Sequence, residues 1–129
     1  MLINGILNPH INSLLARVRH TNLLVIADRG FPFWPMIETV DISLVNGIPT
    51  ILQVYSAIRL NFQIQEIIMA QEFLEVNPPD VVKVFTDATA SHQVTFESHT
   101  QLKSRVPYAV GLIRTGDTTQ YANMILVSG

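Results

Sequence analysis

Short apolar runs alternate with amphipathic segments along the whole chain. The clearest run, 23–27 (Leu-Leu-Val-Ile-Ala), is typical of one buried strand that starts after His20 and ends before Asp28. Segment 62–73 could also form an amphipathic helix, but its first residues alternate between apolar side chains and glutamines, which favours a strand. The remaining strands are predicted at 39–44, 94–98, 109–113 and 123–127.

Helices are predicted where a helix-starting residue precedes an apolar stripe. Asn8-Pro9 opens the first helix, because asparagine is a favoured N-cap and proline is tolerated at the first helical position. This helix should end near His20. The other helices are predicted at 49–57, after the capping segment 77–80, and at 100–105. The helix after 77–80 should bury one face, formed by Val81, Val84, Phe85 and Ala88.

The alternation of helices and strands predicts the fold class. It indicates an α/β protein with one layered domain over residues 1–129, in which helices flank a central mixed β-sheet of about six strands. A chain of 129 residues fits one domain of common size. We find no internal repeat and no linker.

Composition narrows the chemistry and the compartment. The chain has no cysteine, so disulfides and thiolate chemistry are excluded and oxygen and nitrogen groups must do any catalysis. The first 18 residues fit neither a secretory signal nor a transit peptide. No apolar run approaches the roughly 20 residues of a membrane span. We therefore expect a cytoplasmic protein without a membrane span.

Charge is scarce in this chain. A net charge of -2 with scattered Lys and Arg argues against a nucleic-acid partner, because binding phosphates needs clustered positive charge. Only 14% of residues are charged, against about 25% in typical domains. Much apolar area should therefore be buried between subunits, in a symmetric homo-oligomer. The alternative is a monomer covered by Ser, Thr, Asn and Gln.

Polar side chains flank several apolar segments. Burying a polar group costs free energy, so such residues at the ends of buried strands usually indicate a functional site. They are His20, Asp28, His99, Lys103, Tyr121 and Asn123. In open α/β sheets, ligands collect outside the carboxyl ends of the strands, so Asp28 is at the right place to hold one. Tyr121 and Asn123 are two residues apart and would point to the same side of an extended segment.

The order and spacing of several short motifs carry a resemblance to a known family. They are Gly5-Ile6-Leu7-Asn8, His20-Thr21-Asn22, Asp28-Arg29-Gly30-Phe31-Pro32, Asp41, Gly47-Ile48-Pro49, Gln53-Val54, Ser98-His99, Ile113-Arg114-Thr115-Gly116-Asp117 and Tyr121-Ala122-Asn123-Met124-Ile125-Leu126. Over nearly its whole length the chain resembles the D-ribose pyranase family, sugar mutarotases whose sister branch is the fucose mutarotases.

The resemblance implies roles for the flanking polar residues. His20 corresponds to the acid/base residue, Asp28, His99, Tyr121 and Asn123 to sugar contacts, and Lys103 also fits the pattern. It further implies a ring-based homo-oligomer, with a decamer as one option, in which the pocket forms between neighbouring subunits. Two features depart from the ribose branch, which usually has a small residue at Arg29 and less bulk at Phe33-Trp34.

The expected chemistry is the interconversion of pyranose and furanose forms, or of anomeric forms, of ribose or a similar aldose. It needs proton transfer and no cofactor, and histidine suits this because its ordinary pKa is about 6.5. No HxxxH or HxH pair is present, so we expect no metal. Lys103 could equally be solvated, and the other flanking residues could be helix or loop ends. His10 and His92 are interpreted as surface residues.

The sequence leaves two questions open. The rival function is a non-catalytic sugar-binding or regulatory protein associated with carbohydrate uptake, which would need no proton carrier. The loop after Asp28 is also ambiguous, because Phe31, Phe33 and Trp34 could stack on a sugar or cover a subunit interface, which we favour. Adjacent residues that leave a strand face opposite sides, so a ligand-facing Asp28 should turn Arg29 away from the ligand.

Overall fold

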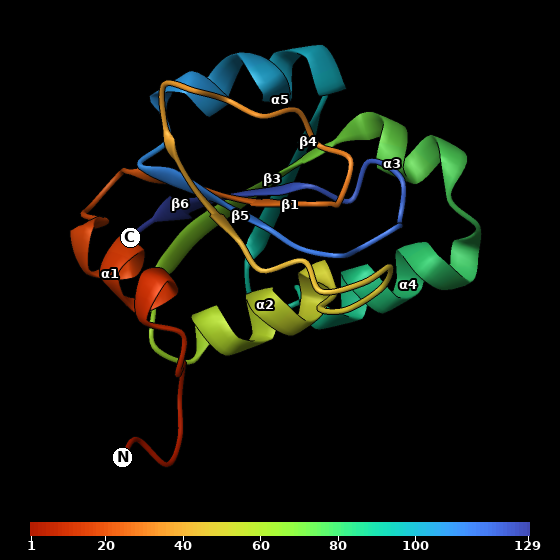
Figure 1. The fold of residues 1–129 in the computed structure, drawn as a ribbon. Helices are drawn as coiled ribbons and strands as arrows, with labels where there is room; N and C mark the ends of the chain where they lie inside the picture. Colours follow the sequence, from red (N-terminus) through yellow and green to blue (C-terminus); the bar gives the residue numbers. More distant parts are fainter.

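Six strands form one mixed sheet in the order β2-β5-β1-β6-β3-β4 (Figure 1). The computed structural model describes all residues 1–129. The strands are β1 (Leu23–Ala27), β2 (Glu38–Asp41), β3 (Ile64–Ala70), β4 (Gln93–Glu97), β5 (Gly111–Arg114) and β6 (Met124–Ser128). The helices are α1 (Pro9–Arg17), α2 (Ile51–Arg59), α3 (Gln71–Val76), α4 (Pro79–Ala88) and α5 (His99–Arg105), with one 3-10 turn at Val106–Tyr108. None of the helices has the length and apolar character needed to cross a membrane.

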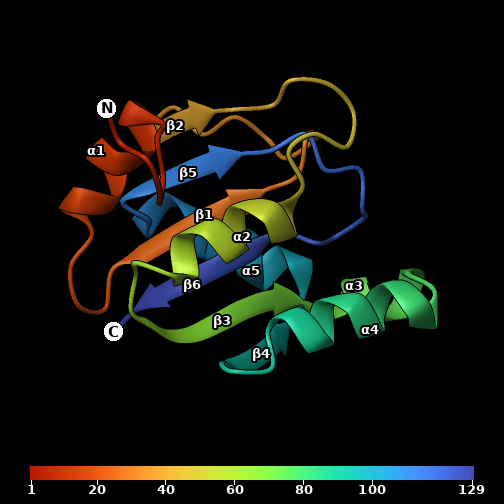
Figure 2. The ribbon, with the colours of Figure 1, turned by 90° about the horizontal axis from the view of Figure 1, so that it is seen from below.

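The direction of the strands decides which loops meet. β5 is parallel to β1 and β2, and β4 is parallel to β3, whereas β6 is antiparallel to both of its neighbours, β1 and β3. Figure 2 shows β6 running against the other strands. The carboxyl ends of β1 to β5 therefore share one edge of the sheet with the amino end of β6. We call this edge the carboxyl edge, and the opposite one the amino edge.

Helices cover both faces of the sheet. α1, α2 and α4 pack against one face, and α5 lies over the other together with the loop between β1 and β2 (Figure 1). Alternate residues of β1 serve the two cores, because Leu24 and Ile26 join the larger apolar cluster while Val25 and Ala27 join the smaller one. The sequence of a strand that is buried on both faces is an unbroken apolar run, as in β1.

The turn between α1 and β1 places His20 outside regular structure. The carboxamide oxygen of Asn8 accepts hydrogen bonds from the backbone N–H groups of His10 (2.9 Å) and Ile11 (3.0 Å), so α1 begins where the sequence predicts. The helix ends at Arg17, three residues before His20. His20 is exposed, in the turn that enters β1 at the amino edge.

Some details of the predicted elements are wrong. The strand expected at 39–44 stops at Asp41, whose carboxylate accepts bonds from the N–H (3.0 Å) and hydroxyl (2.5 Å) of Ser43. The strand expected at 62–73 ends at Ala70, because α3 follows it directly. Val84 is 57% exposed, since the buried stripe of α4 is centred on Phe85. α2 starts at Ile51 behind a Thr50–Gln53 capping box rather than at Pro49.

Buried polar groups tie together the loops at the carboxyl edge. The hydroxyl of Thr115 donates to the carbonyl of Ala27 (2.8 Å), and the carboxylate of Asp117 accepts from the N–H of Ile51 (2.8 Å) at the start of α2. Gly116 lies between them, so close to the turn at 45–48 that a Cβ there would overlap the carbonyl oxygens of Val45 and Ile48. The connection after β5 thus fixes both the loop after β1 and the turn before α2.

Candidate functional site

A pocket of about 330 Å3 opens at the carboxyl edge. Its walls come from three segments: the loop after β1, the first residue of α5 and the connection into β6. The lining residues are Asp28, Gly30, Phe31, Pro32, His99, Gln120, Tyr121 and Asn123. The structure therefore brings together four of the residues that the sequence nominates, Asp28, His99, Tyr121 and Asn123. The antiparallel direction of β6 makes this possible, because it delivers Asn123 to the edge at which β1 ends.

Asp28 and Asn123 are connected directly. The backbone N–H of Asp28 donates to Oδ1 of Asn123 (2.7 Å), and Oδ1 of Asp28 accepts from the N–H of Gly30 (2.8 Å). Asn123 is only 2% exposed. With its amide oxygen engaged, Asn123 has its amide N–H groups left as donors, while Asp28 has an unbonded carboxylate oxygen as acceptor. Together they can bind neighbouring hydroxyls of one ligand.

His99 is held at its backbone and free at its ring. Its N–H donates to both carboxylate oxygens of Glu72 (3.0 and 3.1 Å), while the Ser98 hydroxyl caps α5, so His99 is the first residue of this helix and not its N-cap. The imidazole meets the ring of Tyr121 edge-on, with centroids 4.9 Å apart. Its Nε2 is buried and has no hydrogen-bond partner in the protein. A ligand hydroxyl would satisfy this nitrogen.

The electrostatic surroundings of His99 favour its neutral form. Burial lowers the pKa of His99 below its ordinary 6.5, and the positive charge of Lys103 lowers it further. The carboxylates of Glu72 and Asp28 act in the opposite direction without reversing the shift. The imidazole is therefore neutral at neutral pH and can both donate and accept a hydrogen bond.

Tyr121 has a strained backbone. Its φ is 56°, in the left-handed region that aromatic residues rarely adopt. Such conformations cost free energy and cluster at functional sites. Tyr121 lies just before β6 and lines the pocket together with Gln120 and Asn123.

His20 and Lys103 do not line this pocket. His20 lies at the amino edge, across the full length of β1 from Asp28, and five strand residues at about 3.3 Å each put about 16 Å between the two ends. Within one chain the predicted proton carrier therefore does not reach the predicted sugar contacts. Lys103 is half-buried on α5, one turn after His99, and acts on the pocket through its charge.

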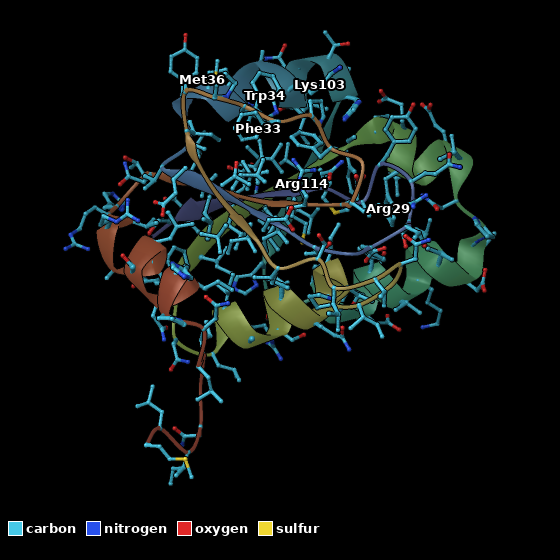
Figure 3. The ribbon with its side chains drawn as sticks, viewed as in Figure 1. Arg29, Phe33, Trp34, Met36, Lys103 and Arg114 are labelled. Carbon is cyan, nitrogen blue, oxygen red and sulfur yellow. The ribbon has the colours of Figure 1, made fainter.

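The aromatic loop after Asp28 divides between core and surface. Phe31 is buried and lines the pocket, and Trp34 packs against it with ring centroids 6.4 Å apart. Phe33 is 70% exposed and touches no part of the pocket wall. Figure 3 shows Phe33, Trp34 and Met36 on the arm of the loop beside α5. Arg29 is exposed and donates to Oδ1 of Asn46 (2.8 Å), so it points away from the pocket as expected.

Some contributing residues escaped the sequence analysis. Glu72 was missed because α3 itself was not predicted, and Gln120 because it lies outside the predicted strands and the recognised motifs. Arg114 ends β5 at the carboxyl edge and contacts the loop after β1, and its position after an apolar run was the available signal. His92, expected at the surface, is half-buried with Nδ1 2.8 Å from the hydroxyl of Tyr55. Nowhere do three His, Asp or Glu side chains converge as metal ligands.

A carboxylate, an amide, a neutral imidazole and a phenol around one pocket of an α/β sheet are typical of proteins that bind small polyhydroxylated molecules. The chain belongs to the RbsD / FucU transport protein family, whose family model matches residues 1–129. This confirms the resemblance seen in the sequence.

Relatives support the assignment over nearly the whole chain. The chain is 40% identical over 126 residues to a D-ribose pyranase of Geobacillus kaustophilus, covering 98% of this chain and 92% of the relative. It is 40% identical over 126 residues to a D-ribose pyranase of Chromobacterium violaceum, covering 98% and 96%.

Solved structures confirm the α/β fold with its mixed six-stranded sheet. The structure of Bacillus subtilis RbsD complexed with D-ribose aligns with a TM-score of 0.90 at 31% identity, covering 100% of this chain and 98% of that one. A fucose mutarotase from Streptococcus pneumoniae in complex with L-fucose gives a TM-score of 0.80 at 20% identity, covering 95% and 92%. The second likeness shows the fold alone.

Proposed function

We propose that this protein is a cofactor-free isomerase that interconverts the pyranose and furanose forms of ribose or a similar aldose. The observation that carries the proposal is the convergence of Asp28, His99, Tyr121 and Asn123 on one pocket from segments far apart in the sequence. The relatives named D-ribose pyranase and the D-ribose complex of Bacillus subtilis RbsD support ribose as the substrate.

The pocket offers a distinct partner to each part of a monosaccharide. Its volume of about 330 Å3 lies at the small end of the range of about 300–1,000 Å3 for ligand pockets. The free carboxylate oxygen of Asp28 accepts a hydrogen bond from one sugar hydroxyl, and the amide N–H of Asn123 donates to another. The unpartnered Nε2 of His99 and the hydroxyl of Tyr121 complete the contacts.

The reaction requires only the movement of protons. The anomeric hydroxyl loses its proton while the ring oxygen gains one, which opens the ring to the aldehyde. Attack by a different hydroxyl then closes the other ring, and the protons return in the reverse order. One positioned acid/base group contributes roughly 10²–10⁴-fold to such a step. We assign this role to His20.

His20 has to come from a second copy of the chain. It is exposed at the amino edge, so an assembly that brings the amino edge of one copy to the carboxyl edge of another completes the site. A second copy would also cover apolar side chains that the single chain exposes, which include Phe33, Met36, Leu44, Val45, Ile48 and Tyr108. We expect a ring-based homo-oligomer, in the cytoplasm, with a decamer as one option and a mass well above 14.4 kDa by light scattering.

Complementation between two inactive variants tests this arrangement. His20→Ala removes the proton carrier and Asp28→Asn weakens the pocket, so each variant alone should show little ring-form exchange of ribose by saturation-transfer NMR. Co-expressed chains assemble into mixed oligomers, in which some pockets combine an intact Asp28 with an intact His20 of a neighbour. Exchange should then return. If mixed oligomers remain as inactive as the separate variants, His20 does not act between copies.

The second candidate function is sugar binding without catalysis. It is favoured by the absence of His20 from the pocket of the single chain, since a binding or regulatory protein tied to carbohydrate uptake needs no proton carrier. Saturation-transfer NMR with a panel of aldoses separates the two functions, because it detects ring-form exchange at equilibrium. Wild-type protein that binds ribose but leaves its exchange rate at the uncatalysed value would overturn the isomerase assignment.

A further inference from the structure

We propose that Arg114 is a positioning residue that fixes the pocket loop, residues 28–32, in its sugar-binding shape, although it does not touch the sugar. This inference rests on the proposed function for its sugar. The loop supplies half of the pocket lining, namely Asp28, Gly30, Phe31 and Pro32. Arg114 itself is absent from the pocket wall. It therefore acts from behind the loop.

The guanidinium of Arg114 gathers three carbonyl groups of this segment. Nη1 donates to the carbonyl of Phe31 and, at 3.4 Å, to that of Arg29, while Nη2 donates to the carbonyl of Pro32 at 3.4 Å. No other group donates to these three carbonyls. Figure 3 shows Arg114 within the arch of the loop that joins β1 to β2. Its side chain is only 12% exposed, and the bond to the carbonyl of Phe31 is half-buried, whereas the bonds to the carbonyls of Arg29 and Pro32 lie at the surface.

Asp41 holds the guanidinium from the opposite side. Arg114 is level with Ala27 of β1 and with Asp41 of β2 in the sheet, and its Nε lies 3.6 Å from Oδ2 of Asp41. Burial alone would raise the pKa of Asp41, but hydrogen bonds from Ser43 and the charge of Arg114 outweigh it and lower the pKa. Asp41 is therefore ionised at neutral pH and keeps Arg114 aimed at the loop.

The shape of arginine is essential to this arrangement. Its planar fork presents five N–H donors in fixed directions, whereas a lysine at the same place offers a single charged point. A lysine could still pair with Asp41 but could not hold three separate carbonyls. We call this set of bonds, from Arg114 to the carbonyls of Arg29, Phe31 and Pro32, the clamp. If the clamp holds the loop, a positive charge alone at position 114 should not restore sugar affinity.

The test compares Arg114→Gln and Arg114→Lys with Arg17→Gln as a matched control. Arg17 pairs with Glu38 at the start of β2, as Arg114 pairs with Asp41 at its end, but it makes no contact with the pocket loop. Sugar affinity is read from the Kd of ribose, and catalysis from the KM and kcat of ring-form exchange. Emission of Trp34, the only tryptophan, reports the loop independently of activity because Trp34 packs against Phe31.

We expect both Arg114 variants to raise the Kd and the KM for ribose about tenfold, with kcat within about threefold of wild type, because one charge-assisted interaction with the loop is lost. Trp34 emission should shift to longer wavelength in both. Arg17→Gln should change neither the KM nor the emission. Should Arg114→Gln not fold, Arg114→Lys carries the same test.

Two results would overturn the proposal. One is an unchanged Kd with unchanged Trp34 emission in a folded Arg114 variant, and the other is full recovery of affinity in Arg114→Lys, which would assign the effect to the ion pair with Asp41. Wild-type protein that binds ribose without catalysing exchange would contradict only the proposed isomerase function. The clamp would then be judged from the Kd and the Trp34 emission.

Discussion

At the carboxyl edge of the sheet, Asp28, His99 and Asn123 are buried or half-buried and held by bonds that involve the backbone, whereas at the amino edge His20 is exposed in a turn. Asn123 bonds to the N–H of Asp28 and Glu72 to that of His99, so side chains of the protein hold the backbone of the pocket wall. The amino edge has no comparable enclosure around its histidine. A pocket held by the protein's own bonds at one edge, and an exposed histidine at the other that we propose as the proton carrier, suit a site that is completed only when two copies meet.

The two edges share one feature, a residue with positive φ. Thr21 next to His20 has φ 68°, and Tyr121 has φ 56°. Neither a β-branched nor an aromatic side chain favours this region. Tyr121 is itself a proposed sugar contact, and Thr21 is next to the proposed proton carrier His20, which supports treating the amino edge as part of the site.

The largest expected effect comes from replacing His20 at the amino edge. His20→Ala should slow ring-form exchange of ribose by roughly 10²–10⁴-fold, because His20 is the proposed proton carrier, while the Kd for ribose changes little. Saturation-transfer NMR measures the exchange and calorimetry the binding. Unchanged exchange in a folded, assembled variant would contradict the assignment of proton transfer to the amino edge and of sugar binding to the carboxyl edge.

Replacing one asparagine at each edge compares how much the two edges contribute to the free energy of unfolding. Asn123→Ala should lower the free energy of unfolding by about 1–3 kcal/mol, because the half-buried N–H of Asp28 loses its acceptor, and it should also weaken ribose binding. Asn22→Ala removes a similar bond at the amino edge, from the exposed N–H of Arg19 (2.8 Å). Denaturant unfolding should show a smaller loss for Asn22→Ala and no change in ribose affinity. Equal losses would mean that the two edges are equally ordered.

The pH dependence of ribose binding tests the protonation state of His99. Since burial and Lys103 lower its pKa below 6.5, affinity should hold as the pH falls to about 6.5 and decline only at lower pH, when the imidazole takes up a proton and stops accepting. The stability contributed by neutral His99 is lost in the same direction, as the pH falls through the lowered pKa.

Two variants should move that decline in opposite directions. Lys103→Met removes a positive neighbour, so the pKa of His99 rises and affinity falls at higher pH than in wild type. Glu72→Gln removes a negative neighbour and moves the decline to lower pH. NMR titration of the His99 ring follows both shifts directly, and identical midpoints in all three proteins would contradict the assignment.

The smallest expected effect concerns Arg29. Arg29→Ala removes an exposed bond to Asn46, so stability should change by no more than about 0.5 kcal/mol and the ranking of ribose, other aldoses and ribose 5-phosphate should stay the same. Competition binding measures the ranking. A changed ranking with the assembly intact would show that Arg29 reaches the sugar after all.

The sequence predicted most of the fold because its local signals are strong. The apolar run of β1 and the Asn8 cap of α1 each identify an element unaided. α3 was missed because no side chain caps its start and no glycine or proline separates it from β3. Val84 was misassigned because helical spacing alone does not say whether a stripe centres on it or on Phe85.

The site was predicted as a set of residues and not as a geometry. Asp28 and His20 bracket one strand, so they had to lie at opposite edges, but only the strand order shows which other residues accompany each. The antiparallel insertion of β6 between β1 and β3 joins Asn123 to Asp28, and such long-range pairing leaves no local trace in the sequence. The apolar residues that cover the sheet do not indicate which strands β6 pairs with or in which direction it runs.

The close approach at Gly116 has a consequence for how freely this sequence can vary. Gly116 touches no sugar, yet any side chain there would push against the carbonyls of Val45 and Ile48 and move the chain on either side, including Thr115 and Asp117. In a library of all single substitutions, position 116 should therefore be as intolerant as Asp28, whereas the neighbouring Thr118, exposed on the same connection, should accept most residues.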